Sequence, residues 1–304
     1  MLILIAGITG MVGQPLARTA LADGHSVRGL SRNPDNLPTE ISSQLESFVT
    51  CRDYFDTEAY AKAVKGVDVV IAALPTVPSI VGAGQLALLL EAEKAGVKVF
   101  HAASWNFDWT RLSLGDHETY DAYMSFKRLA ELSSGLKPIY GFCGTILEYM
   151  FINYKKDGRR AAIDVENKMA MYGGSGEEKM SLTSVDDLAK YTLAAVTDEE
   201  IIQRGVYYVE SFRCTFPELA DMYGKVRGME IKKQCVGGQA ELEGMLAQAR
   251  QFMGPLQVNQ YIELAYGLAI LKGVAVCDPS DNKRWEDKIT PIGFEQWLNE
   301  HPEV

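Results

Sequence analysis

The sequence predicts an α/β fold, in which a doubly wound parallel sheet stands beside a smaller, mostly helical region. Two observations predict this fold. Short, continuously apolar segments, such as residues 67–74 and 97–103, are typical of strands buried on both faces of a parallel sheet. Segments with helical spacing of apolar residues alternate with these strands through the first half of the chain. Residues 1–150 are therefore predicted to form a Rossmann-type domain.

The first predicted elements are a strand at residues 1–6 and a helix at residues 15–23, joined by a glycine-rich turn. The turn reads Gly7-Ile8-Thr9-Gly10-Met11-Val12-Gly13. Glycine at such a corner lets the backbone approach a phosphate and lets the helix lie close to the strand. The amide groups at the helix start, together with the helix dipole, would then hold a pyrophosphate. We therefore expect a dinucleotide to contact Gly7, Thr9, Gly10, Met11, Val12 and Gly13.

The end of the next predicted strand, residues 26–30, indicates which dinucleotide binds. A site for NAD usually places a carboxylate there, which accepts a hydrogen bond from the ribose 2′-hydroxyl. Here the strand runs into Ser31-Arg32-Asn33-Pro34, and the first acidic residue is Asp35. Ser31 and Arg32 stand where a 2′-phosphate would lie, and a guanidinium can bind a phosphate through two hydrogen bonds. The sequence thus predicts NADP(H) as the cofactor, the alternative being that Arg32 is a solvated loop charge.

The following elements continue the alternation of strands and helices. We expect strands at residues 47–49, 67–74, 97–103 and 139–142, and helices at residues 58–64 and 84–95. Ligands of such sheets bind at the carboxyl ends of the strands, so the segments after these strands should line the same crevice as the glycine turn. Leu74, Pro75 and Ala103 are therefore predicted to contact the cofactor.

The second half of the chain is less regular. A helix at residues 186–196, capped by Ser184, and a strand at residues 205–210 are predicted to return to the Rossmann domain, which therefore includes residues 184–210. The substrate-binding region is expected to comprise residues 151–183 and 211–304. Its predicted helices are residues 218–226 and 240–253.

Tyr123 and Lys127 are the main candidates for catalysis. They are four residues apart in a predicted helix and so share one face of it. Such a pair can reduce a carbonyl, because the ammonium lowers the phenol pKa and holds the cofactor ribose, while the phenol protonates the oxygen. Which of the two donates the proton stays open, and a half-buried tyrosine beside a solvated lysine is the alternative. Ser104, which follows the strand at residues 97–103, is expected to donate a hydrogen bond to the same oxygen, the alternative being that it caps the following segment.

Aromatic and methionine side chains predict a pocket for a bulky apolar substrate. The expected substrate contacts are Trp105, Phe107, Trp109, Tyr149, Met150 and Phe151, with a helical wall of Met245, Phe252, Met253, Tyr261 and Tyr266. Such residues also form ordinary cores, so only part of this set is expected to touch substrate. No metal site is predicted, because Asp116-His117-Glu118 lie in one short loop and cannot complete a coordination shell.

Composition excludes several classes of function. The 304 residues are 47% hydrophobic and 23% charged, which is typical of a soluble globular enzyme. A net charge of −10 without a basic cluster argues against binding to nucleic acid. The apolar residues 69–90 are interrupted by prolines and glycines and are not expected to span a membrane. Five scattered cysteines fit a reducing compartment, so we expect a cytoplasmic protein, monomeric or homodimeric, that acts on a small molecule.

In this order, the motifs resemble those of the NmrA-like branch of the atypical short-chain dehydrogenase/reductases, which includes the isoflavone reductase-like enzymes. The matching segments are the glycine turn, the arginine turn, Gly66-Val67-Asp68-Val69-Val70, Phe126-Lys127 with Leu129-Ala130-Glu131, and Ser184-Val185-Asp186-Asp187-Leu188-Ala189. The segment Gly293-Phe294-Glu295-Gln296-Trp297-Leu298 is similar to fungal members in particular.

The resemblance implies an NADPH-binding fold in which Lys127 carries the acid–base work, with or without Tyr123. It implies a reductase of a carbonyl, imine or conjugated alkene in an aromatic-rich secondary metabolite, with or without cyclisation or isomerisation of the product. The alternative is a non-catalytic NADP(H)-binding sensor that regulates a protein partner. The chain departs from the plant pattern twice, with Ser104-Trp105-Asn106-Phe107 for Ser-Glu-Phe-Gly and Arg52-Asp53-Tyr54 for Gly-Asp-Leu. The first departure concerns the substrate, and the second concerns contacts to adenine.

Overall fold

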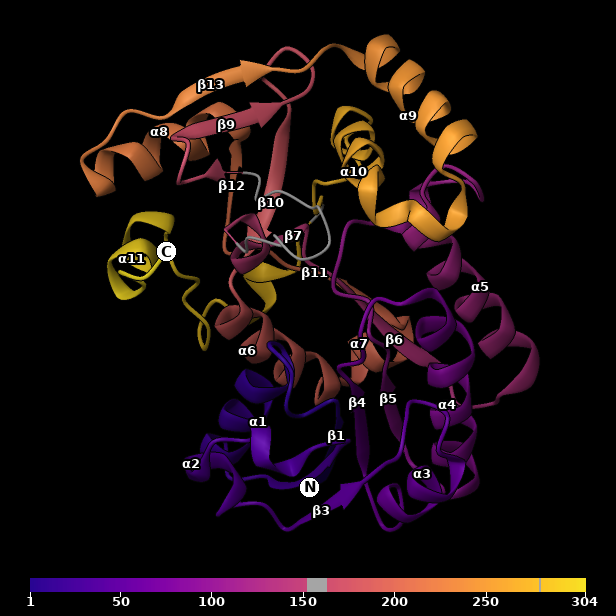
Figure 1. Cartoon of the computed structure of the whole chain (residues 1–304). Helices are drawn as coiled ribbons and strands as arrows, with labels where there is room; N and C mark the ends of the chain where they lie inside the picture. Colours follow the sequence, from indigo (N-terminus) through magenta and orange to yellow (C-terminus); the bar gives the residue numbers. More distant parts are fainter. Residues whose placement is uncertain (152–162, 279) are drawn as a thin grey trace.

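The computed structural model describes residues 1–151, 163–278 and 280–304. Its largest sheet has seven parallel strands in the order β11-β6-β5-β4-β1-β2-β3 (Figure 1). The strands are β1 (Leu2–Ala6), β2 (Ser26–Ser31), β3 (Ser47–Thr50), β4 (Val69–Ala72), β5 (Val99–His101), β6 (Pro138–Phe142) and β11 (Val206–Tyr208). From β1 the chain builds β2 and β3 on one side, then crosses to β4 on the other. This order confirms the predicted doubly wound sheet of Rossmann type.

Helices cover both faces of this sheet, and successive side chains of a strand point to opposite faces, so both sets of side chains are buried. In β1, Ile3 and Ile5 enter the core that α1 and α6 cover, whereas Leu4 and Ala6 enter the core that α3, α4 and α5 cover. The helices are α1 (Gly13–Ala22), α2 (Thr39–Ser42), α3 (Thr57–Ala63), α4 (Gln85–Lys94), α5 (Glu118–Ser133), α6 (Val185–Val196) and α7 (Glu199–Arg204). The two buried faces explain why the strands read as continuous apolar runs.

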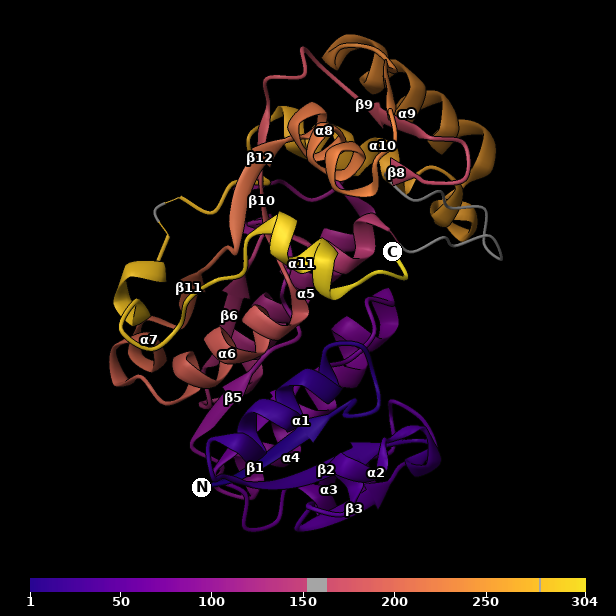
Figure 2. The ribbon, with the colours of Figure 1, turned by 90° about the vertical axis from the view of Figure 1, so that its left-hand side faces the viewer.

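A second region lies beyond the carboxyl ends of β6 and β11 (Figures 1 and 2). Its helices are α8 (Phe216–Arg227), α9 (Gln239–Met253), α10 (Ile262–Leu271) and α11 (Phe294–Glu300). Two small sheets accompany them, β12-β10-β7 and β13-β9-β8. Their strands are β7 (Thr145–Ile146), β8 (Ile163–Asp164), β9 (Met169–Tyr172), β10 (Lys179–Thr183), β12 (Phe212–Thr215) and β13 (Lys232–Cys235). Helices α8 and α9 agree with the sequence prediction, whereas α10, α11 and these strands were not predicted.

Short helical turns connect several of these elements. They span Pro34–Asn36, Ile80–Gly84, Trp109–Arg111, Leu147–Met150, Pro255–Gln260 and Asn282–Trp285. The turn at Ile80–Gly84 has π-helical geometry and leads directly into α4. In the parts of the chain that the structure describes, no helix has the length and apolar character needed to cross a membrane.

The chain returns to the large sheet after it has entered the second region. Helix α6 begins at the predicted cap, where the Ser184 hydroxyl accepts a hydrogen bond from the Asp187 amide at 3.2 Å. Strand β11 then pairs in parallel with β6, with Tyr207 opposite Gly141. The chain thus rejoins the sheet within the expected residues 184–210, while the boundary near residue 150 stays a prediction.

Candidate functional site

The turn between β1 and α1 is shaped by two glycines that leave no room for a side chain. Gly7 has a φ of +87°, and a Cβ built there would lie 2.1 Å from the carbonyl oxygen of Ala73. A Cβ on Gly13 would lie 2.2 Å from the carbonyl oxygen of Gly7. The turn can therefore lie against the end of β4, and α1 against the turn, only with glycine at both positions.

Hydrogen bonds stabilise this turn internally and also connect it to the end of β2. The Gly10 amide donates to the Gly7 carbonyl at 2.9 Å, and the Gln14 side-chain amide donates to the Thr9 carbonyl at 3.1 Å. The hydroxyls of Thr9 and Ser31 are 2.7 Å apart. No side chain caps the start of the ten-residue helix α1. The Gln14 amide bonds to the Gly10 carbonyl and Pro15 has no N–H, so the Gly13 amide is the one in the first turn that remains available to an anion.

A pocket of about 200 Å³ opens between this turn and the ends of β2 and β4. Seven of the predicted cofactor contacts line it: Gly7, Thr9, Gly10, Ser31, Arg32, Leu74 and Pro75. The other lining residues are Ala6, Leu30, Cys51, Tyr54, Tyr60 and Ala73, which the sequence analysis did not select. Met11, Val12, Gly13, Ala103 and Lys127 do not line it. The pocket is smaller than the roughly 300–1,000 Å³ typical of whole-ligand sites, so its size suits the adenosine end of a dinucleotide.

Arg32 dominates the electrostatics of this pocket. Its guanidinium carbon lies 4.6 Å from the centre of the Tyr54 ring, a cation–π contact. Among the described residues that line the pocket there is no aspartate or glutamate. Neighbouring Cys51 is buried, and this burial raises the pKa of its thiol, so it adds no negative charge. The pocket is therefore electrostatically suited to a phosphate.

Tyr123 and Lys127 lie in different surroundings on α5. The Tyr123 side chain is 2% exposed and stacks on Trp109, with ring centroids 5.8 Å apart. Burial raises the pKa of the Tyr123 phenol, so this group stays protonated at neutral pH. The Lys127 side chain is 41% exposed and forms an ion pair with Glu131. Of the two, only Lys127 is accessible at the surface.

Ser104 is held by hydrogen bonds between β5 and β6, and its expected catalytic role stays a prediction. Its side chain is fully buried, and its hydroxyl accepts a hydrogen bond from the Gly141 amide at 2.9 Å. The same hydroxyl donates to the Ala102 carbonyl at 3.2 Å. These bonds fasten the end of β5 to β6 and leave the hydroxyl closed off from a ligand.

The aromatic residues of the loop after β5 divide between the two cores of the large sheet. Trp105 stacks on His101 at 4.8 Å and donates from its indole nitrogen to the Thr192 hydroxyl at 2.9 Å. It therefore belongs to the core under α6. Phe107 and Trp109 lie in the opposite core, and both are also almost fully buried.

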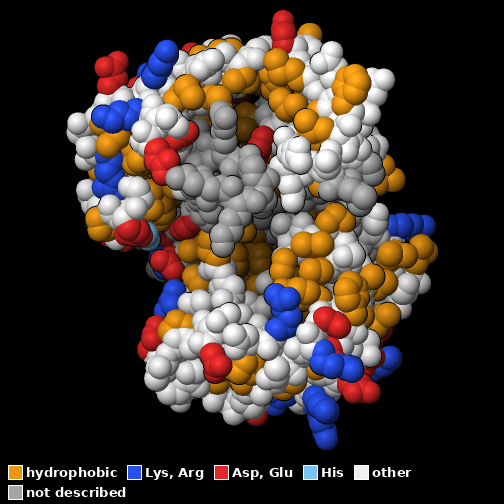
Figure 3. Space-filling view, viewed as in Figure 1, with side chains coloured by type: hydrophobic (Ala, Val, Ile, Leu, Met, Phe, Trp, Pro, Cys, Tyr) orange, Lys and Arg blue, Asp and Glu red, His pale blue; other side chains and the backbone are white. Residues whose placement is uncertain are grey.

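The remaining predicted substrate contacts are similarly divided. Met150 is buried, and Phe151 stacks on Tyr223, Phe294 and Trp297 in a cluster at α8 and α11. Tyr149 is 41% exposed. On α9, Met245, Phe252 and Met253 are exposed, and Figure 3 shows apolar side chains over this part of the surface. Of the expected helical wall, Tyr261 is buried, and Tyr266 meets the Phe107 ring edge-on at 5.8 Å.

Asn106 connects three tyrosines and was not selected from the sequence. Its side-chain oxygen accepts hydrogen bonds from the Tyr120 hydroxyl at 2.5 Å and from the Phe107 amide at 3.1 Å. The same side chain also interacts with the Tyr123 and Tyr266 phenols. The sequence signal was the departure from the plant pattern at this position, which indicated a changed substrate site without saying how.

His117 lies beside this cluster. Its ring stacks on Tyr120 at 4.1 Å and meets Tyr266 edge-on at 4.4 Å. Its neighbour Glu118 forms an ion pair with Arg250 at 2.7 Å, which joins α5 to α9. No group of three metal-ligating side chains occurs in the residues that the structure describes.

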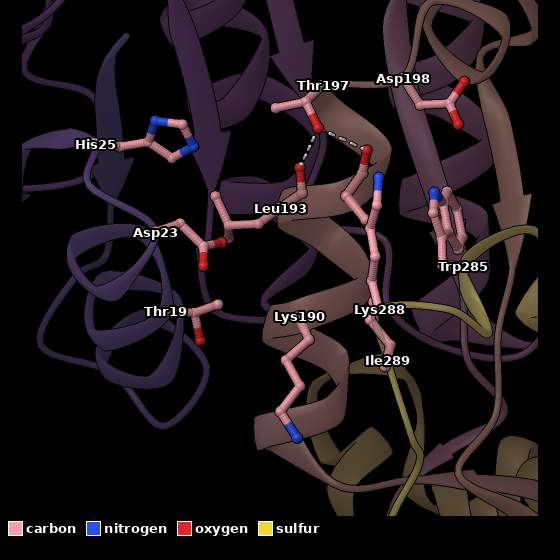
Figure 4. Close-up of a pocket in the computed structure, with 11 residues that line it drawn as sticks. Thr19, Asp23, His25, Lys190, Leu193, Thr197, Asp198, Trp285, Lys288 and Ile289 are labelled. Carbon is pink, nitrogen blue, oxygen red and sulfur yellow. Dashed lines mark hydrogen bonds between the residues drawn. The ribbon is translucent and has the colours of Figure 1, made fainter.

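A second hollow, of about 690 Å³, lies on the side of the large sheet that α1 and α6 cover (Figure 4). It is lined by Thr19, Asp23, His25, Lys190, Leu193, Ala194, Thr197, Asp198, Trp285, Lys288 and Ile289. Its charged side chains have both signs, and none of the predicted site residues lines it. The cofactor pocket remains the candidate functional site.

Comparison with known proteins places the chain in a family. Pinoresinol reductase 2 of Arabidopsis thaliana is 27% identical over 254 residues, which cover 78% of this chain and 77% of that protein. A crystal structure of isoflavone reductase shares the fold, with a TM-score of 0.79 and 21% identity over 98% of both chains. A binary complex of leucoanthocyanidin reductase with NADPH from Vitis vinifera gives a TM-score of 0.76 and 20% identity over the full length of both chains. The model of the NmrA-like family matches residues 1–272, and the chain belongs to this family.

Proposed function

We propose that the chain is an NADPH-dependent reductase of a carbonyl, imine or conjugated alkene in a medium-sized, aromatic-rich metabolite. The observation that carries the proposal is the pocket at the end of β2, where Arg32 stands and no lining residue is acidic. A site for NAD would hold a carboxylate at this place. Relatives named pinoresinol reductase and bifunctional pinoresinol-lariciresinol reductase support a secondary-metabolite reductase.

The residues of the pocket fit NADP(H). The glycine turn and the uncapped start of α1 would hold the pyrophosphate, because they present amide groups with no Cβ in the way. Ser31 and Arg32 would hold the 2′-phosphate, and Leu74 and Pro75 would line the path from the end of β4. When bound, NADPH supplies the hydride.

We assign the role of proton donor in the reduction to Lys127. Its ammonium is accessible on α5, whereas the Tyr123 phenol is buried under Trp109. A lysine can donate a proton to the oxygen, nitrogen or carbon that becomes negative as hydride arrives. Tyr123 then acts as a buried support that interacts with Asn106.

The substrate would meet the aromatic side of the second region. Tyr266 and Asn106 are only partly buried, and they join Phe107 and Tyr120 in one aromatic and polar cluster. Exposed Met245 and Met253 on α9 extend an apolar surface for an aromatic ligand. Whether reduction is followed by cyclisation or isomerisation depends on the substrate itself.

The test is a titration of the purified chain with NADPH, NADP⁺, NADH and NAD⁺ in one buffer. We expect both phosphorylated forms to bind more tightly than their partners, and with similar affinity in either redox state. Aromatic ketones, imines and enones, which carry the bonds named in the proposal, are the first probes for NADPH consumption. Racemic pinoresinol is a further probe, because two of the relatives are named for it. Equal binding of NADH and NADPH would contradict the cofactor assignment. Tight binding of one redox state without turnover would instead favour the regulator.

We further propose that the chain acts on its small-molecule substrate in the cytoplasm as a monomer or homodimer, without nucleic acid or membrane. The acidic net charge of −10 and the scattered cysteines support this proposal. Light scattering behind size-exclusion chromatography measures the oligomeric state directly.

A further inference from the structure

We propose that Tyr54 is a positioning residue for Arg32, and that this pair, rather than Arg32 alone, sets the preference for a phosphorylated ribose. The proposal rests on the proposed use of NADP(H). It adds Tyr54, which was not among the cofactor contacts predicted from the sequence.

The geometry of the pair leaves Arg32 ready to bind an anion. The guanidinium lies over the face of the Tyr54 ring, 4.6 Å from its centre. A cation–π contact uses none of the guanidinium N–H groups as hydrogen-bond donors, and no described residue accepts a hydrogen bond from Arg32, so these donors stay free. Arg32 is otherwise exposed and forms no ion pair with any described carboxylate. The ring therefore restrains the cation without using the groups that would bind phosphate.

Tyr54 is itself held in place by the surrounding framework. Its carbonyl oxygen accepts a hydrogen bond from the hydroxyl of Tyr60 at 2.6 Å, and the Tyr60 side chain is 1% exposed. The same carbonyl lies close to Gly84, where a Cβ would approach it to 2.7 Å. This segment thus lies against the π-helical turn that precedes α4, and the ring projects from a fixed backbone.

The charged residues next to Tyr54 form ion pairs and hydrogen bonds with other residues of the same turn. Arg52 forms an ion pair with Asp56 at 2.9 Å, and Asp56 also caps α3 by accepting from the Ala59 amide. The Asp53 carboxylate accepts a hydrogen bond from the Phe55 amide at 2.7 Å. The acids nearest to Arg32 in this turn therefore stabilise the turn itself, and the ring of Tyr54 is the group that Arg32 contacts.

The Tyr54 ring also lines the pocket, so it could act as a pocket wall or as a positioning residue for Arg32. An experiment can distinguish these two roles. A pocket wall would contact adenine and would matter equally for NADPH and NADH. A positioning residue for Arg32 would matter for NADPH alone, because only NADPH carries the 2′-phosphate. The ratio of the two dissociation constants is therefore the decisive quantity.

The experiment measures Kd for NADPH and NADH by nucleotide fluorescence on the full chain. For Tyr54→Ala we expect NADPH binding to weaken by about three- to tenfold, the range of a partly exposed cation–π contact, and NADH binding to change less than about twofold. Tyr54→Phe keeps the ring and should keep the wild-type ratio. Tyr54→Leu keeps the bulk without the aromatic face and should behave as Tyr54→Ala, which retains the test if the alanine variant does not fold.

Phe55→Ala is the matched control, because Phe55 is an exposed aromatic residue of the same turn that does not line the pocket. It should leave both constants unchanged. In the Arg32→Ala background, Tyr54→Ala should no longer weaken NADPH binding. Equal weakening for both nucleotides would overturn the positioning role and leave Tyr54 as a wall. A wild-type chain without preference for NADPH would overturn the proposed cofactor as well.

Discussion

Lys127 and Glu131 form an ion pair one turn apart on the exposed face of α5. The pair holds the lysine at the surface and lowers the pKa of the Glu131 carboxyl through their hydrogen bond. The proposed proton donor is thus restrained by a neighbour that substrate binding would have to displace or tolerate.

Lys127→Ala should abolish turnover while leaving NADPH affinity within several-fold of wild type. We expect kcat to fall by about a hundredfold or more, because general acid catalysis typically contributes this much. Steady-state kinetics and a nucleotide titration on the same preparation measure the two effects. Glu131→Gln is the matched variant, since it removes the partner and keeps the lysine, and it should retain turnover. Unchanged kcat in Lys127→Ala would refute the assignment.

Tyr123→Phe should retain turnover within about threefold, because a phenol that is 2% exposed cannot reach substrate without rearrangement. The ring still stacks on Trp109, but the variant loses the interaction of the phenol with Asn106, so the melting temperature should fall by a few degrees. Steady-state kinetics and thermal denaturation test this prediction together. A loss of kcat as large as that of Lys127→Ala would identify the phenol as the proton donor instead.

Ser104→Ala should lower the free energy of unfolding and leave kcat unchanged. It leaves the buried Gly141 amide without its partner, which typically costs about 1–3 kcal/mol. Urea denaturation measures the loss, and the folded fraction should retain its kcat. Ser125→Ala is the control, because the Ser125 hydroxyl bonds to Asp121 on the exposed side of α5. A stable Ser104→Ala variant with greatly reduced kcat would restore the catalytic role expected from the sequence.

Gly7→Ala should prevent formation of the cofactor site. The Cβ of the introduced alanine would lie 2.1 Å from a backbone oxygen, and a φ of +87° is strained for alanine. We therefore expect the free energy of unfolding to fall by at least about 2 kcal/mol. Gly244→Ala offers the contrast, since Gly244 lies in α9 with open space around its Cβ. That change should stabilise the chain by about 0.5–1 kcal/mol. Denaturant titration compares both, and equal effects would contradict this account of the turn.

His117 should make the fold sensitive to acid. Burial lowers the pKa of His117 to about 4, whereas an unfolded histidine titrates near pH 6.5. Between these values the unfolded chain binds more protons, so stability is complete above about pH 6.5 and falls as pH decreases towards 4. His101, whose pKa burial lowers to about 3, acts in the same direction.

His117→Phe should flatten this dependence, because it keeps a ring against Tyr120 and Tyr266 and removes one titrating group. Urea denaturation at several pH values between about 7.5 and 4.5 measures the slope. The same slope in both proteins would show that His117 does not contribute.

The sheet could be predicted because its strands carry their own signal. β1, β4 and β5 are largely apolar segments. The glycine turn after β1 indicates that the cofactor binds at the carboxyl ends of these strands. The second region gives no such signal, since β13 is exposed along its whole length and pairs with β9, about 60 residues earlier. A pairing of this kind lies outside any local pattern.

The site was predictable to a similar degree. Residues of the glycine and arginine turns carry a motif, so the sequence predicts them as cofactor contacts. Tyr54 and Cys51 carry no such motif and line the pocket because β3 lies beside β2. Trp105 and Phe107 are two residues apart, which in a regular strand would place them on one face. They enter opposite cores because β5 ends at His101, before either residue, and the chain bridges to Phe142 at Asn106.

The outermost position of β11 has a consequence for how the protein is made. Residues 1–142 leave the ribosome before residues 206–208, so the edge of β6 stays unpaired while residues 143–205 are synthesised. Helix α6, which covers the same face as α1, also arrives late. An unpaired edge beside an uncovered apolar face attracts wrong partners. We therefore expect a gene fragment that ends at residue 150 to aggregate more readily than the full chain, because it lacks both β11 and α6.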